Sequence, residues 1–240
     1  LVITGRQRLQ ILLSYIQVYL KSDVEKAKDN LDLAMKEEAP LDLKIAFYDR
    51  LAVYYKISGD TDRAIKTIED FLATVPPEHD YRVMYRLAAM HNDLGVFYSD
   101  QKNIEEAQEH LSLALNIWKR YNIRRFLGLI YNNLSDLYLK QGITIVAEDY
   151  SRQAFSYANE LNLTTIKALA LLNQGEAKIK MGEFQEAEIQ LMACESLIKS
   201  IGSTAYLDSV KRNLALAKSK IKGFGHYHLF LKEREPELIN

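Results

Sequence analysis

Proline and glycine are scarce in this sequence, at 4 and 10 of 240 residues. Because both weaken the interior of a helix, their scarcity favours long helices. Cysteine occurs once, at Cys194, which excludes an internal disulfide and a cysteine-rich zinc site. A single cysteine also fits a reducing compartment, so we expect a cytoplasmic protein.

Charge of one sign and long apolar runs are also lacking. Lys and Arg number 31 and Asp and Glu 32, so the net charge is −1. Nothing therefore draws the whole chain to nucleic acid or to an anionic membrane. No run of about 18 apolar residues is present, so no membrane insertion is expected. The hydrophobic share of 48% is typical of a globular chain and excludes a disordered one.

What the sequence does have is an internal repeat. An alanine follows each of five short polar turns, at successive gaps of 37, 43, 40 and 40 residues: Ala27, Ala64, Ala107, Ala147 and Ala187. Five residues earlier comes a turn position: Ser22, Gly59, Lys102, Gly142 and Gly182. Twelve residues earlier the residue is small in most units: Tyr15, Ala52, Gly95, Ser135 and Gly175. Five matches in series indicate a repeat architecture.

This pattern resembles the tetratricopeptide repeat, which has a first helix, a tight turn with glycine, and a second helix that packs back on the first. A small residue in the first helix would let the second helix approach closely, and a turn glycine would end the first helix with a positive φ. Pro40 and Pro76 fall where second helices should stop. The period near 40 is similar to that of kinesin light chains, cell-polarity adaptors and several bacterial regulators.

The resemblance implies an all-α fold: a right-handed α-solenoid of about five helix pairs and a C-terminal capping helix. We expect a single domain over 1–240, with repeats at 8–44, 45–87, 88–127, 128–167 and 168–207. The capping helix and tail are expected over 208–240. Because the sequence begins with Leu1 rather than Met, we also expect a fragment of a longer protein or a processed terminus.

Polar residues form columns on the first helices, which line the concave face in the fold that this sequence resembles. The column just before each core leucine holds Arg50, Asp93, Asn133 and Asn173. Positions three and seven further along include Asp136, Lys140, Glu176 and Lys180. Spacings of three and four place these residues on one helix face. We expect this set of eight residues to bind a partner.

The asparagines have the chemistry to hold a peptide, because an amide pairs with both the N–H and the C=O of a peptide bond. In several families with units of about 40 residues, asparagine in this column binds the ligand backbone, and the resemblance implies the same for Asn133 and Asn173. The alternative is that these amides bind water or a neighbouring helix. The charged residues of the set are expected either to pair with one another or to tune the groove.

Other candidates have simpler explanations. KRYNIRR, residues 119–125, is most often a solvated basic loop, although an acidic partner or a phosphate would also suit it. His226 and His228 lack the further ligands of a metal site. Cys194 and His91 stand in repeat core slots, so we expect packing. No phosphate loop, nucleophile elbow or zinc-protease motif is present, so we expect no catalytic residues, cofactor or metal.

The sequence therefore predicts a protein-interaction scaffold that binds a peptide or helical segment of a partner protein. The alternative is a sensory arm of a larger bacterial transcription regulator or signalling protein. Nucleic-acid binding by this domain is not expected. Self-association as a homodimer through terminal helices stays open, and so does occupation of the groove by the C-terminal tail.

Overall fold

The computed structural model describes residues 5–16, 24–34, 40–76, 80–204 and 206–222. Within these ranges it contains eleven α-helices and no strand. The chain divides into two compact units, unit 1 (residues 1–121) and unit 2 (residues 122–240). The predicted all-α class is confirmed, whereas the prediction of a single domain stays a prediction.

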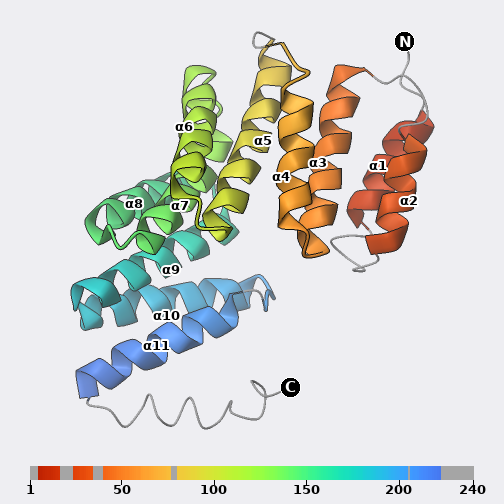
Figure 1. Ribbon diagram of the computed structural model, residues 1–240. Helices are drawn as coiled ribbons and strands as arrows, with labels where there is room; N and C mark the ends of the chain where they lie inside the picture. Colours follow the sequence, from red (N-terminus) through yellow and green to blue (C-terminus); the bar gives the residue numbers. More distant parts are fainter. Residues whose placement is uncertain (1–4, 17–23, 35–39, 77–79, 205, 223–240) are drawn as a thin grey trace. The chain divides into compact units, whose positions relative to one another are not determined.

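Unit 1 contains three antiparallel helix pairs (Figure 1). They are α1 (Gly5–Ile16) with α2 (Val24–Ala34), α3 (Leu41–Ile57) with α4 (Thr61–Leu72), and α5 (Tyr81–Asp100) with α6 (Ile104–Arg120). Unit 2 contains α7 (Arg124–Lys140) with α8 (Thr144–Glu160), α9 (Thr164–Met181) with α10 (Phe184–Ser200), and α11 (Leu207–Lys222). The predicted helix-pair solenoid is confirmed.

Each unit has two layers of helices. Every helix packs on the next one in its unit, and the odd-numbered helices also contact one another: α1 with α3, α3 with α5, α7 with α9, and α9 with α11. We call the odd-numbered helices the inner layer and the even-numbered helices the outer layer. The helix predicted as a cap, α11, is thus a further inner-layer helix of unit 2.

The inner-layer helices begin earlier than the predicted repeat boundaries. α3, α5, α7 and α9 start at residues 41, 81, 124 and 164 rather than 45, 88, 128 and 168. The repeat period sets the spacing of helices, but the residue before each helix sets its start. Pro40 precedes α3, and the Asp80 side chain caps α5 by accepting from the backbone N–H of Arg82 at 2.8 Å.

The predicted turn position is confirmed wherever it is described. Gly59, Gly142 and Gly182 have φ of 85°, 77° and 84°, and Lys102 adopts the same left-handed region at 65°. A lysine there bears a steric cost that glycine avoids. A second left-handed position recurs where outer helices end, at Asn122, Asn162 and Gly202, and the sequence analysis did not identify it.

The small residues of the inner helices allow close helix approach, as predicted. A Cβ added to Gly175 would lie 2.5 Å from Leu191 Cγ on α10, and one on Gly95 would lie 2.5 Å from Leu111 Cγ on α6. Gly128, which is buried in α7, differs from these two glycines. A Cβ added there would lie 3.4 Å from its nearest atoms, which is an ordinary contact.

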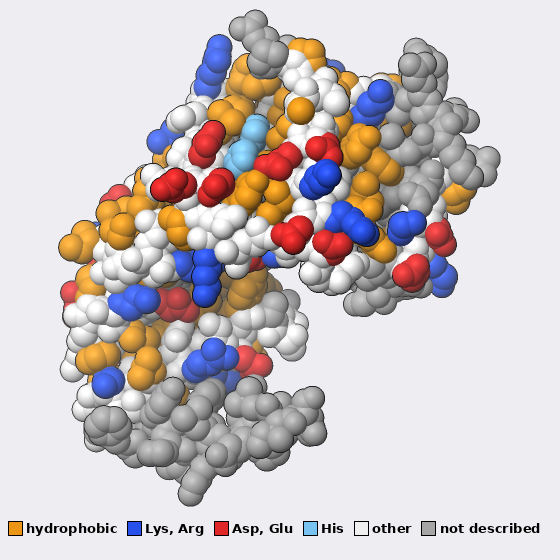
Figure 2. Space-filling model, viewed as in Figure 1, with side chains coloured by type: hydrophobic (Ala, Val, Ile, Leu, Met, Phe, Trp, Pro, Cys, Tyr) orange, Lys and Arg blue, Asp and Glu red, His pale blue; other side chains and the backbone are white. Residues whose placement is uncertain are grey.

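A histidine pair joins α5 to α6. The Nδ1 atoms of His91 and His110 lie 3.1 Å apart, and the two rings stack with centroids 5.2 Å apart. Tyr98 stacks on His110 at 5.7 Å. Figure 2 shows the histidine side chains together on one face, with acidic side chains on both sides.

Unit 2 has tyrosines at the positions 40 residues later. Tyr131 stacks on Tyr150 at 5.9 Å, and Tyr138 stacks on Tyr150 at 5.5 Å. The same packing slot therefore holds uncharged rings in unit 2 and titratable rings in unit 1.

Burial disfavours the charged form of both histidines. Burial, together with the charge of His110, lowers the pKa of His91 to about 4. Burial also lowers the pKa of His110, although Glu109, Glu69 and Glu106 act in the opposite direction. As the pH falls below about 6.5, these two histidines therefore become protonated in the unfolded chain before they do so in the folded one.

We predict that Gly175→Ala destabilises the protein by about 1–3 kcal/mol relative to Gly128→Ala, because only the first added methyl overlaps a neighbouring side chain. Both substitutions gain similar helix propensity, which makes Gly128→Ala the matched control. Urea denaturation followed by circular dichroism measures the difference. Equal stability of the two variants would contradict the close approach.

We predict that the contribution of the histidine pair to the free energy of unfolding of unit 1 decreases between pH 7 and pH 5, by at most about 2 kcal/mol for His91 alone. The sign follows because the folded pKa lies below the unfolded one. In the double variant His91→Tyr, His110→Tyr, which copies the tyrosines of unit 2, this decrease should largely disappear. Denaturation followed by fluorescence of Trp118, the single tryptophan and buried in unit 1, measures it. If the double variant keeps the same pH dependence, the histidine pair is not its source.

Candidate partner-binding face

Each inner helix leaves one stripe of residues accessible to solvent. On α7 most residues are buried, and the accessible stripe is Leu129, Asn133, Asp136 and Lys140. On α5 the corresponding stripe is Ala89, Asp93, Val96 and Asp100. The residues predicted on α5 and α7 thus lie on the accessible sides of these helices, because the other sides pack against neighbouring helices.

The stripe continues over α9 and α11. On α9 it holds Leu169, Glu176 and Lys180, and on α11 it holds Ser209, Asn213, Leu216 and Lys220. The sequence analysis missed Asn213 and Lys220 because it treated 208–222 as a cap. The signal was present, since Asn133, Asn173 and Asn213 follow the same 40-residue period.

Hydrogen bonds from two asparagines set the register of the inner helices in unit 2. Asn173 Nδ2 on α9 donates to the backbone oxygen of Asn132 on α7 at 3.1 Å and to its Oδ1 at 3.2 Å. Asn213 Nδ2 on α11 donates to Glu176 Oε1 on α9 at 2.7 Å. Residues about 40 positions apart therefore lie side by side on adjacent helices.

Asn133 and Asn173 differ in their surroundings. Asn173 is 7% exposed and its amide nitrogen bonds to the neighbouring helix, which is the alternative that the sequence left open. Asn133 is half-buried on the accessible stripe. Of the two amides, Asn133 has the more accessible side chain.

The charged residues of the stripe interact with one another. Lys140 Nζ lies 2.9 Å from Asp136 Oδ2. Burial raises the pKa of Glu176 and the charge of Asp136 adds to the increase, whereas the Asn213 hydrogen bond and the charges of Lys180 and Arg212 lower it. The face therefore combines hydrogen-bonding groups with charges of both signs.

In unit 1, the predicted Arg50 and Asp93 lie on adjacent helices. Arg50 pairs with Asp49 at 2.8 Å, and Asn92 Nδ2 donates to Asp93 Oδ1 at 3.2 Å. Burial, together with the nearby carboxylate of Asp49, raises the pKa of Asp93 to about 8, although the Asn92 hydrogen bond and the charge of Arg50 act in the opposite direction. A protonated Asp93 can donate a hydrogen bond, which an ionised one cannot.

Lys178 stands where earlier units have Tyr98 and Tyr138, and Gln174 stands where they have Leu94 and Leu134. The structure gives each of the two a partner. Lys178 Nζ lies 3.1 Å from Glu148 Oε1 and also pairs with Glu183. Burial opposes ionisation of Glu148, but Arg152 and Lys178 outweigh it and lower its pKa. Gln174 Nε2 donates to the backbone oxygen of Ser151 at 3.2 Å.

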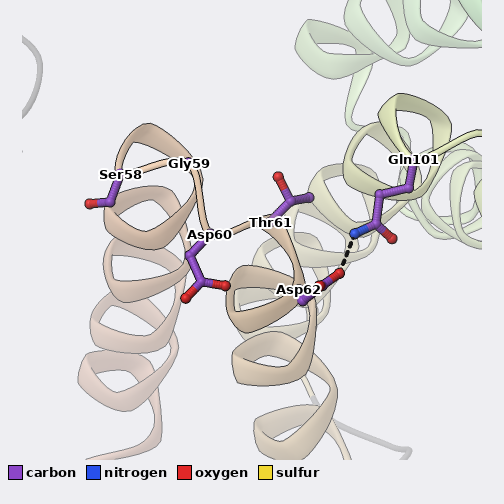
Figure 3. Close-up of a pocket in the computed structure, with 6 residues that line it drawn as sticks. All are labelled: Ser58, Gly59, Asp60, Thr61, Asp62 and Gln101. Atoms are coloured by element: carbon purple, nitrogen blue, oxygen red, sulfur yellow. Dashed lines mark hydrogen bonds between the residues drawn. The ribbon is translucent and has the colours of Figure 1, made fainter.

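An open depression of about 440 Å³ lies at the α3–α4 turn (Figure 3). Its lining consists of Ser58, Gly59, Asp60, Thr61, Asp62 and Gln101. The acidic groups already have structural roles: Asp60 caps α4 through the N–H of Arg63, and Asp62 accepts from Gln101 Nε2 at 2.5 Å. We therefore attribute this depression to the structure of the α3–α4 turn and do not assign it as a binding site.

The remaining candidates from the sequence are Cys194, the basic segment 119–125 and the histidines of the tail. Cys194 is buried, its Sγ lies 3.0 Å from the backbone oxygen of Ala168, and burial raises the pKa of its thiol to about 12, so the core prediction is confirmed. In the basic segment, Arg124 pairs with Glu160 at 2.5 Å. His226, His228 and the tail 223–240 lie outside the described residues.

Among the described residues, no group of three or more His, Cys, Asp or Glu side chains is arranged to hold a metal ion. None of the described helices has the length and apolar character needed to cross a membrane.

Residues 85–160, which run from α5 to the end of α8, match the model of the tetratricopeptide repeat family. Over these residues the chain matches tetratricopeptide repeats. An uncharacterized protein of Haemophilus influenzae is 29% identical over 112 residues, which are 47% of this chain and 54% of that protein. The match thus spans about half the length of that relative.

Solved structures with tetratricopeptide-like helix pairs are similar to this chain. BtubC (BKLC) from P. vanneervenii superposes with a TM-score of 0.68 at 19% identity, over 81% of this chain and 80% of that one. A Rap protein in complex with competence and sporulation factor superposes with a TM-score of 0.67 at 12% identity, over 95% and 64%. At these identities the likeness is one of fold.

We predict that Asn173→Ala lowers the stability of unit 2 by about 1–3 kcal/mol, because the buried acceptors on Asn132 lose their donor. Asn159→Ala, on the exposed end of outer helix α8, is the matched control and should change stability by less than about 0.5 kcal/mol. Urea denaturation followed by circular dichroism compares them. Equal effects would argue against an inter-helix role for Asn173.

Proposed function

We infer that the accessible stripes of α7, α9 and α11 together form a face that holds an extended segment of a partner protein. The observation that carries this proposal is the register between these helices, which aligns polar residues 40 positions apart. An extended segment that crosses three helices would meet a polar side chain on each. One protein of the same fold is solved with competence and sporulation factor, so such a stack can hold a partner.

The residues of this face have different roles in the proposal. Asn133 contacts the segment directly, because its amide pairs with both sides of a peptide bond. Asn173 is a positioning residue that holds α7 against α9. Asp136, Lys140, Glu176 and Lys180 set the charge of the face. Each hydrogen bond to the segment would contribute about 0.5–1.5 kcal/mol.

A role in partner binding is also predicted for Arg50 and Asp93 of unit 1, and it stays a prediction. The remaining predictions from sequence also stand as such: a sensory arm with an attached effector, absence of catalysis, cytoplasmic location and self-association.

We predict that short peptides selected from a random library on the intact chain bind through Asn133. Asn133→Ala should weaken their binding about two- to tenfold, which corresponds to one lost hydrogen bond. Asn159→Ala on the outer layer is the matched control and should leave the affinity unchanged. Isothermal titration measures both, with circular dichroism as a check of folding. Peptides that are insensitive to Asn133→Ala would place binding elsewhere.

A further inference from the structure

A row of lysines follows the inner layer of unit 2. Lys140, Lys180 and Lys220 are exposed, and each lies in the last turn of its helix, α7, α9 and α11. They are 40 residues apart. We call these three side chains the lysine row.

The register of the helices places the lysine row on adjacent helices at similar heights. The bonds Asn173–Asn132 and Asn213–Glu176 join residues 41 and 37 positions apart, and the lysine spacing lies between these values. Packed helix axes lie about 8–10 Å apart. Successive lysines are therefore separated by roughly one helix diameter across the face.

The balance of charge along the row is positive. One turn before Lys140 comes Asp136, with which it pairs, and one turn before Lys180 comes Glu176. The equivalent position before Lys220 is Leu216, which carries no charge. Arg212 adds a further cation near Glu176. Four cations thus accompany two carboxylates on this face.

We propose that the lysine row selects an acidic partner segment that carries a carboxylate at about every third residue. A chain in the polyproline II conformation has three residues per turn and rises about 3.1 Å per residue. Every third side chain therefore faces the same way, and three residues span roughly 9 Å, which matches the separation of neighbouring inner helices. This inference rests on the proposed function, because the segment must cross α7, α9 and α11 as described there. It adds the spacing and the charge of the partner.

A continuous polyanion fits this face less well than a peptide. Asp136 and Glu176 lie one turn from the first two lysines, so a chain with a charge at every unit would approach both carboxylates. A peptide with isolated carboxylates can place neutral residues there. The amides along the stripe also match peptide bonds better than phosphates.

The test uses three blocked peptides of equal length on the intact chain. One is Glu-Ser-Ala-Glu-Ser-Ala-Glu, one has glutamine in place of glutamate, and one has its three glutamates adjacent. Fluorescence anisotropy at low and physiological salt should give the tightest binding for the spaced peptide, with an affinity that decreases as salt screens the charges. Equal binding of the spaced and glutamine peptides would overturn the proposal, and so would no measurable binding of the spaced peptide.

Variants then assign the contacts. Lys180→Gln and Lys220→Gln should each weaken the spaced peptide about twofold to fivefold, as expected for an exposed ion pair. Lys199→Gln, an exposed lysine of outer helix α10, is the matched control and should have no effect. Tighter binding of an oligothymidylate through the same lysines would overturn the peptide assignment. Library peptides that depend on Asn133 but not on Lys180 and Lys220 would overturn the lysine row alone and leave the proposed function intact.

Discussion

The close approach of outer helices to small residues on their inner partners, shown by Gly95 in unit 1 and Gly175 in unit 2, is the constraint on which both units depend. In unit 2, α10 lies so near α9 that a single methyl on Gly175 would overlap Leu191. This spacing buries nearly every side of an inner helix except one stripe. Because packing excludes solvent from the other sides, the stripe is where an inner helix can meet a partner.

Because the repeat recurs, the accessible stripes of successive inner helices of unit 2 form a continuous surface. Inner helices of unit 2 contact one another directly, so a residue on α7 has its counterparts 40 positions later on α9 and again on α11. Hydrogen bonds between asparagines and their neighbours maintain this register. The lysine row and the amides thus gain a defined spacing that no single repeat could provide.

The same slot can also acquire different chemistry in different repeats. The aromatic positions between inner and outer helices hold tyrosines in unit 2 and histidines in unit 1, with similar ring stacking. Packing tolerates both ring types, but only histidine changes its charge near neutral pH. A position that is purely structural in one repeat can therefore make another repeat sensitive to pH.

The sequence alone determined the all-α class, the helix pairs and the turn positions, and for α5 and α7 also the side that solvent reaches. These follow from local rules, because a period of 40 residues and helical spacing are visible in one dimension. Helix starts differed by several residues, since caps such as Asp80 act independently of the repeat period. Only the tertiary structure decided which amide is buried: Asn173 bonds to a neighbouring helix, whereas Asn133 is half-buried on the accessible stripe. It also showed that α11 continues the inner layer, because contacts between helices, and not the pattern within one helix, define where a face ends.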